Sequence, residues 1–314
     1  MSFVNDVKAR LANKIRAMVQ SEVDKRVAEI LPQLLEFHNS PQEMRQSFHD
    51  HTKDPANSHD TYIAMRNQLD QLGVKVEDAS IDVSDFRKWL NSYPEIDAAY
   101  RGSEDVYIEK CLEHYLSFTY LDLSPTDTFI DIASAGSPFY ELLHRRIGLT
   151  SYCLDLSYPK GIHNRNIGAD AGDTGLNKGF ATAMALHCAY ECFMGDADIR
   201  FVREAARILR PGGRYVIVPL YIDNTYFIAT SPYCNQDDII FDSGSLKVWR
   251  DDPYRVPFSR HYSPQSFAQR IYSRIPGDMA GTVYFMENLP DVWKSFRGQR
   301  VYCYFLFMCI KSKS

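Results

Sequence analysis

The chain has 314 residues, of which 45% are hydrophobic and 24% are charged, and its formal net charge at pH 7 is -5. This is an ordinary globular composition, and the length allows one large core plus an accessory region. The acidic balance argues against a general nucleic-acid-binding protein, because such proteins need excess cations to neutralise phosphates.

Residues 1–37 carry an apolar stripe that predicts one amphipathic helix. Apolar residues recur every three or four positions: Val4, Val7, Leu11, Ile15, Met18, Val19, Val23, Val27, Ile30, Leu31 and Leu34. Steps of four are frequent, so a strict heptad and a long left-handed coiled coil are not indicated. The stripe suits self-association into a homo-oligomer. Packing on the chain's own domain and contact with a membrane surface are the alternatives.

Residues 38–120 are expected to form a linker followed by helices. Residues 38–60 are polar and rich in turn formers, and the spacing of His49, His51 and His59 is not typical of a metal site. From Thr61 to about Tyr120 the apolar spacing is helical. No apolar run reaches the length of a membrane span, and the first six residues lack the charged-then-apolar pattern of a signal peptide.

The segment 127–143 predicts a buried strand, a tight turn and a helix start. Phe129, Ile130 and Ile132 supply strand-forming bulk, Ser137 can cap the helix and Pro138 suits its first position. The turn between them is made of small residues that let a ligand approach the backbone: Ala133, Ser134, Ala135 and Gly136. It has one glycine where a dinucleotide fingerprint has three, so a phosphate-free nucleoside such as S-adenosylmethionine fits it better than a pyrophosphate.

Further strands and helices follow in the order of a doubly wound sheet. A strand over 151–156 ends near Asp155, where such folds place an acid on the ribose hydroxyls. A loop with Asp170 follows, then the apolar run 180–186. After it, Asp196 can cap a helix. Residues 210–213 form a turn that connects this helix to a strand over 214–221.

These segments resemble the class I S-adenosylmethionine-dependent methyltransferases over roughly residues 121–221. The resemblance rests on Asp131–Gly136, Asp155, Gly168–Asp170, His187–Phe193 and, most specifically, Glu204–Gly213. The first motif departs from D-x-G-x-G-x-G, because Ala133 and Ala135 stand at glycine positions. The resemblance implies an α/β Rossmann-like doubly wound sheet of seven strands, S-adenosyl-L-methionine as the cofactor, and a cap formed by the helices of 38–120. The chain also looks like methyltransferases of surface-polysaccharide or glycan biosynthesis.

The resemblance implies a set of cofactor-binding residues at the carboxyl ends of the strands: Asp131, Ala133, Ala135, Gly136, Asp155, Asp170 and His187. Methylation of a hydroxyl also needs a base for its proton. His187 and Glu191 lie just past the fourth strand, and His187 is favoured because histidine titrates near neutral pH. The alternative is that His187 only packs the strand end or touches the cofactor. His261 is the reserve base.

The methyltransferase domain is expected to span 121–314, with an insertion over about 222–275. The insertion is rich in Tyr, Trp, Arg, Asn and Asp, which suits a polar small molecule or saccharide as the substrate; a structured surface excursion is the alternative. The apolar runs 280–286 and 300–310 predict a final antiparallel pair of strands at the sheet edge.

The seven cysteines lie mostly in apolar surroundings without a disulfide framework, so we expect a reduced, cytoplasmic chain. Cys188 and Cys192, next to His187, are interpreted as structural, and no metal is expected. Two other classes stay open. One is a nicotinamide-dependent sugar-modifying enzyme. The other is a non-catalytic adapter with the methyltransferase fold, for which Ala133 and Ala135 are the sequence hint.

Overall fold

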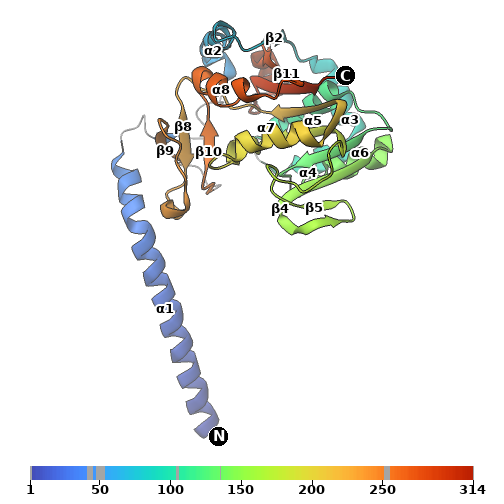
Figure 1. Ribbon diagram of the computed structural model, residues 1–314. Helices are drawn as coiled ribbons and strands as arrows, with labels where there is room; N and C mark the ends of the chain where they lie inside the picture. Colours follow the sequence, from blue (N-terminus) through green and yellow to red (C-terminus); the bar gives the residue numbers. More distant parts are fainter. Residues whose placement is uncertain are drawn as a thin grey trace.

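The computed structural model of the chain describes residues 2–40, 45–46, 54–103, 106–134, 136–250 and 255–313, with the backbone alone for 2–13 and 45–46. The helices are α1 (Ser2–Asn39), α2 (His59–Gln71), α3 (Val83–Ser92), α4 (Pro94–Tyr100), α5 (Tyr107–Leu121), α6 (Phe139–Ile147), α7 (Ala197–Ile208), α8 (Pro264–Arg270) and α9 (Leu289–Ser295). His49 and His51 lie outside the described residues. Figure 1 shows a body of sheets and helices from which α1 projects.

The main sheet comprises β2 (Val76–Ala79), β3 (Thr128–Ile132), β4 (Thr150–His163), β5 (Asn166–Gly168), β6 (Ala181–His187), β7 (Leu209–Val218), β11 (Met279–Met286) and β12 (Phe305–Lys311). Their order is β2-β11-β12-β7-β6-β3-β4-β5. β3 lies between β4 and β6 and is parallel to both. The chain moves outward from β3 through β4 to β5 and then returns to β6 and β7 on the other side. This reversal is the switch point of a doubly wound sheet, which confirms the predicted fold class.

Two details of the predicted sheet need correction. Within the described residues the main sheet has eight strands instead of seven, because β2 pairs in parallel with β11. The segment 61–120 was expected to be helical throughout, and β2 is too short to alter its periodicity. β11 and β12 do form the predicted antiparallel pair, but β12 lies inside the sheet between β7 and β11.

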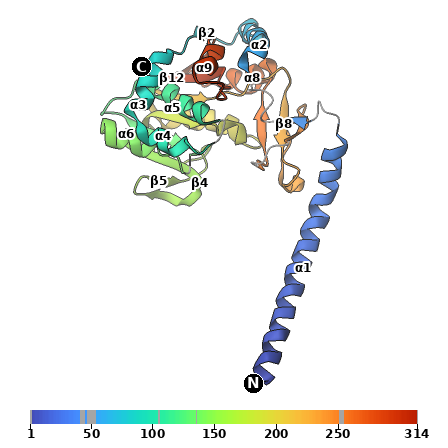
Figure 2. The same ribbon diagram turned by 180° about the vertical axis from the view of Figure 1, so that it is seen from behind.

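The central strands are apolar along most of their length because helices cover both faces of the sheet. In β6 every residue from Ala183 to Leu186 is wholly buried. α7 stands in front of the sheet in Figure 1, and α4 and α5 stand in front of it in the opposite view of Figure 2. α5 packs on β6 and β7, so it is a core helix, and only its first turns reach the candidate site.

The helix after the predicted turn begins at Phe139, one residue later than expected. Ser137 accepts a hydrogen bond from the Phe139 amide at 3.2 Å, and its own hydroxyl donates to Oδ2 of Asp131 at 3.0 Å. α6 ends at Gly148, whose φ of 84° closes the helix in the left-handed region. The turn is therefore held to the end of β3 by a side chain as well as by the backbone.

The second sheet comprises β1 (Arg45–Gln46), β8 (Phe227–Thr230), β9 (Leu246–Arg250) and β10 (Ser259–His261), in the order β1-β9-β8-β10. Three of these strands come from the predicted insertion. Its Arg260 is wholly buried and pairs with Asp198 of α7 at 3.0 Å and with Asp242 at 2.6 Å. The pair with Asp198 attaches the second sheet to the main body, and the pair with Asp242 lies within the insertion.

α1 confirms the predicted N-terminal helix, and its apolar stripe faces solvent. The large apolar side chains are roughly half exposed: Ile15 52%, Met18 65%, Val19 58%, Val23 47%, Val27 49%, Leu31 49% and Leu35 53%. These seven side chains therefore do not pack on the chain's own domain, whereas Ile30 and Leu34 of the stripe are partly buried. The end of α1 meets β9, where Glu36 pairs with Lys247 at 3.2 Å. Over the part of the chain described here, no helix combines the length and the apolar character needed to cross a membrane.

Candidate functional site

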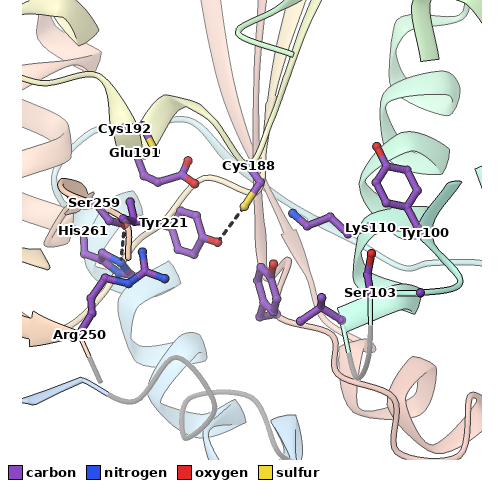
Figure 3. A pocket seen from close by; sticks show the side chains of 14 residues that line it. Tyr100, Ser103, Lys110, Cys188, Glu191, Cys192, Tyr221, Arg250, Ser259 and His261 are labelled. Carbon is purple, nitrogen blue, oxygen red and sulfur yellow. Dashed lines mark hydrogen bonds between the residues drawn. The ribbon is translucent and has the colours of Figure 1, made fainter. Parts of the chain in front are cut away.

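A cavity of about 460 Å³ lies where the two sheets and the α4–α5 connection meet (Figure 3). Its lining combines aromatic rings with charged and sulfur-bearing side chains: Tyr100, Gly102, Ser103, Val106, Lys110, Cys188, Glu191, Cys192, Tyr221, Arg250, Val256, Ser259, His261 and Tyr302. Its size and mixed lining suit a small-molecule ligand. Of the residues proposed from the sequence, Glu191 and His261 line it, and His187 does not.

Strand direction explains why residues distant in the sequence meet here. β6 and β7 are parallel, with His187 opposite Val218, so Cys188 and Tyr221 follow them at the same edge of the sheet. β12 runs antiparallel to β7, so the residues before it, including Tyr302, reach that edge as well. The carboxyl edge of parallel strands is where open α/β sheets bind ligands.

Glu191 is the carboxylate that faces this cavity. It sits in the short 3-10 turn η5 (Tyr190–Cys192), is 7% exposed, and its Oε2 has no hydrogen-bond partner among the described residues. Burial raises the pKa of the Glu191 carboxyl to about 6, against the opposing effects of its backbone amide and Lys110. A carboxylate with that pKa can take up a proton near neutral pH.

The backbone before Glu191 has an unusual conformation. Cys188, directly after β6, has a φ of 48°, which a residue with a Cβ seldom adopts. Its Sγ lies 3.4 Å from the Tyr221 hydroxyl (Figure 3). This sharp turn carries the chain from β6 into η5 and aims Glu191 at the cavity.

His261 reaches the cavity because its neighbours in β10 are fixed to the main body. Arg260 points to the buried Asp198 of the main body, and alternation along a strand turns His261 to the opposite face. Nε2 of His261 lies 3.3 Å from the Ser259 hydroxyl, and its ring stacks on Phe227 with centroids 4.4 Å apart. Nδ1 lies 3.9 Å from the Asp223 carboxylate. The sequence suggestion that the insertion brings His261 to the site fits this placement.

α5 fixes the opposite wall of the cavity. Lys110 Nζ pairs with Glu113 at 2.8 Å. Glu109, one residue earlier, is wholly buried, and its Oε2 accepts hydrogen bonds from the amides of Tyr302 at 2.7 Å and Cys303 at 3.4 Å. Burial and the neighbouring Glu113 raise the pKa of the Glu109 carboxyl well above its usual range.

His187 belongs to a separate, buried network at the end of β3 and β6. Its side chain is 5% exposed. Nδ1 lies 3.1 Å from Oδ1 of the wholly buried Asp131, and Nε2 lies 2.8 Å from the hydroxyl of Ser117. Because a carboxylate only accepts hydrogen bonds, Nδ1 donates to Asp131, and the Ser117 hydroxyl holds Nε2 on the other side of the ring. Both ring nitrogens are thus engaged away from the cavity.

Tyr100 and His114 connect this network to the cavity wall. Nε2 of His114 lies 2.9 Å from the Tyr100 hydroxyl, and the His114 ring meets the His187 ring edge-on at 4.3 Å. Burial and the adjacent His187 hold the pKa of His114 well below its usual range, so its ring is neutral. Tyr100 lines the cavity itself, which places the cavity next to the His187 network.

The small-residue turn follows β3 and is exposed at Gly136. Ala133 has a φ of 52°, and its amide donates to the Leu154 carbonyl at 2.7 Å. At Gly136, whose φ is 87°, an added Cβ would meet nothing within 4 Å. Ala135 lies outside the described residues. Open backbone at this turn fits close approach by a ligand without phosphates.

The two acids proposed for the cofactor follow the neighbouring strands. Asp155 lies where β4 stops pairing in parallel with β3, and its Oδ1 accepts from the Ser157 amide at 2.9 Å. Asp170 lies two residues after β5; its carboxylate pairs with Arg200 at 2.9 Å and accepts from the Gly172 amide at 2.7 Å. The turn and both acids therefore stand in a row along one edge of the sheet.

Sequence reasoning missed much of the cavity wall, notably Tyr100, Lys110, Tyr221 and Tyr302. Only the proximity of β12 to β7 brings Tyr302 into the site, and no local pattern signals it. Among the residues that the structure describes, no group of three or more His, Cys, Asp and Glu side chains could hold a metal ion.

No protein-family model and no curated protein matches the sequence. Among solved structures, the chain is similar to 1,6-didemethyltoxoflavin-N1-methyltransferase of Burkholderia thailandensis, with 13% identity and a TM-score of 0.41 over 76% of this chain and 94% of that one. It is similar to geranyl diphosphate C-methyltransferase of Streptomyces coelicolor, with 13% identity and a TM-score of 0.39 over 64% and 78%. It is also similar to an S-adenosylmethionine-dependent methyltransferase of Methanosarcina mazei, with 12% identity and a TM-score of 0.38 over 63% and 98%. Because these values are low, the fold is assigned from the strand order and the site from its own side chains.

Proposed function

We propose that the chain is an S-adenosylmethionine-dependent methyltransferase that methylates an oxygen of a polar small molecule or saccharide. The observation that carries the proposal is the cavity at the carboxyl edge of β6 and β7, which Glu191 lines with a buried carboxyl group whose Oε2 has no hydrogen-bond partner among the described residues. The resemblance of Asp131–Gly136 and Glu204–Gly213 to the methyltransferase motifs supports the choice of cofactor.

Three groups of this chain would hold the cofactor. The open turn at Gly136 suits its amino-acid end, and Asp155 suits the two ribose hydroxyls. Asp170, already oriented by Arg200, lies beyond Asp155 along the same edge, where the base of the nucleoside would extend. When bound, the cofactor supplies a methyl group on a positively charged sulfur. His187 and Ser137 keep Asp131 and the turn in place.

The acceptor would bind in the cavity, between the aromatic walls of Tyr100, Tyr221 and Tyr302. Glu191 would accept the proton of the acceptor hydroxyl, and the bound cofactor would supply the methyl group to that oxygen. His261 lines the same cavity and is suited to orient the acceptor through a hydrogen bond. Aromatic rings alternating with charged side chains match a hydroxylated ring such as a sugar, which supports a saccharide acceptor.

We also propose that the chain works in a reducing compartment such as the cytoplasm. All seven cysteines are free thiols in the structure. Cysteines in this state are usual where thiols are kept reduced.

Calorimetric titration of the full chain tests the cofactor. S-adenosylmethionine or S-adenosylhomocysteine should bind with one site per chain, and NAD and NADP should not. Binding of NAD(P) instead would favour the nicotinamide-dependent sugar-modifying enzyme. A folded chain that binds none of them would favour the non-catalytic adapter, in which the Ala residues of the turn have abolished cofactor binding.

A further inference from the structure

The long helix α1 presents an apolar face that the rest of the described chain does not cover. The helix spans 38 residues and projects from the body in both views (Figures 1 and 2). Seven of its large apolar side chains from Ile15 to Leu35 are about half exposed, and Ile30 and Leu34 are partly buried. Such a continuous exposed stripe marks an interaction surface.

Charge along α1 is divided between its two halves. Residues 2–18 hold Lys8, Arg10, Lys14 and Arg16 against the single acid Asp6. Residues 19–39 hold Glu22, Asp24, Glu29 and Glu36 against Lys25 and Arg26. Lys25 and Arg26 both lie within 4 Å of Glu29 on their own helix. The first half of α1 is therefore basic, and the second half is acidic.

We propose that α1 pairs with α1 of a second copy of this chain in an antiparallel arrangement. Antiparallel pairing sets the basic half of each helix against the acidic half of the other, and it also opposes the two helix dipoles favourably. Parallel pairing would place like charges together along both halves. This inference does not depend on the proposed activity.

A membrane surface fits α1 less well than a second copy does. An anionic surface attracts a helix whose polar face is basic throughout. Here the acidic half, with Glu22 and Asp24 exposed, would be repelled, although the apolar stripe continues through it. A second copy of α1 in the opposite direction can cover the apolar stripe and also place a basic half against each acidic half.

The pairing would leave the cavity of each of the two chains accessible. It would also hold α1, and through α1 the second sheet of each chain. The carboxyl end of α1 contacts β9 through Glu36 and Lys247, and the Phe37 ring packs edge-on against Trp249. The residue after Trp249 is Arg250, which lines the cavity. In an antiparallel pair the two bodies lie at opposite ends of the helices, separated by roughly 55 Å, the length of a helix of this size.

Charge reversal in the full-length chain tests the arrangement, with the dimer dissociation constant measured by sedimentation or light scattering. Lys14→Glu with Arg16→Glu should weaken the dimer about tenfold or more, because acidic halves then face acidic halves. Glu22→Lys with Asp24→Lys should weaken it similarly. An equimolar mixture of the two variants should recover dimers, since their halves are again complementary. The control, Lys14→Arg with Arg16→Lys, keeps every charge and should behave as the wild type.

Several outcomes would overturn the proposal. In a parallel pair, Lys14→Glu with Arg16→Glu would strengthen the dimer, because it removes repulsion between the two basic halves. A wild-type chain that stays monomeric at tens of micromolar would exclude pairing through α1. Monomers that bind phosphatidylserine vesicles would identify the membrane as the partner instead. Circular dichroism of each variant confirms that α1 and the body remain folded.

Discussion

The carboxyl end of β6 carries two titratable side chains, His187 and Glu191, in contrasting environments. His187 is buried with both ring nitrogens engaged, by Asp131 and Ser117. Glu191 is buried almost as deeply, yet one of its oxygens has no partner within the described residues, and the residue lines a cavity. Burial with every polar atom satisfied holds a structure together, whereas burial with an unsatisfied atom beside a cavity leaves a group able to react.

The largest expected effect follows from replacing Glu191. Glu191→Gln keeps the size of the side chain but cannot accept a proton, so the rate of methyl transfer should fall by roughly 10²–10⁴-fold, with cofactor affinity nearly unchanged. The wild-type rate should rise with pH through about 6, because only the ionised carboxylate accepts the proton. The variant should lose that rise.

His261→Asn is the matched comparison in the same cavity. If His261 only orients the acceptor, this variant should raise KM and keep the pH rise near 6. A pH rise that disappears in His261→Asn and persists in Glu191→Gln would make His261 the base.

His187→Ala should act mainly on stability. The substitution removes the partner of the buried Asp131 carboxylate and of Ser117, so the free energy of unfolding should fall by about 2–4 kcal/mol in denaturant titration. At a temperature where the variant is folded, the pH dependence of turnover should match that of the wild type. Unchanged stability with lost turnover would restore His187 as the base that the sequence favoured.

Asp155→Ala tests the proposed contact between Asp155 and the ribose of the cofactor. Loss of a carboxylate that accepts from two ribose hydroxyls should weaken S-adenosylmethionine binding by about 1–3 kcal/mol in calorimetry. Asp173→Ala, in the loop after β5, is the control and should leave the affinity unchanged. Equal affinities for the Asp155 variant and the wild type would remove Asp155 from the cofactor site.

The smallest effect concerns the turn itself. Ala133 holds a φ of 52° at a position where the family motif has glycine. Ala133→Gly relieves a strain of about 1–2 kcal/mol and adds chain entropy to the unfolded state, so it should stabilise the fold by about 0.5–1 kcal/mol. Ala185→Gly, in the regular strand β6, should destabilise it instead. Destabilisation by Ala133→Gly as well would show that the turn is not strained.

The small-residue turn proposed to hold the cofactor could be predicted from the sequence. A run of small residues after an apolar strand predicts a turn in any context, because the pattern is local. The same holds for the Asp155 strand end, for α7 and for the N-terminal helix. Each was located from spacing within its own segment.

The order of the outer strands could not be obtained in the same way. β2 is four residues long, and its pairing with β11 joins segments about two hundred residues apart in the chain. The partners of His187 were equally hidden, since Ser117 lies on α5 and meets the ring only after α5 packs on β6. A histidine at a strand end has the same sequence signal whether its nitrogens are engaged or open.

The succession of most strands and helices, the small-residue turn and the N-terminal helix follow from local patterns, because apolar periodicity and backbone preference act over a few residues. Which titratable group lines the cavity, and which apolar side chains stay uncovered, depends on how distant segments pack. Hydrogen-bond satisfaction and burial depend on neighbours that the chain brings together from distant segments, and Glu191, His261 and Tyr302 meet at one cavity only because the sheets and α5 pack as they do.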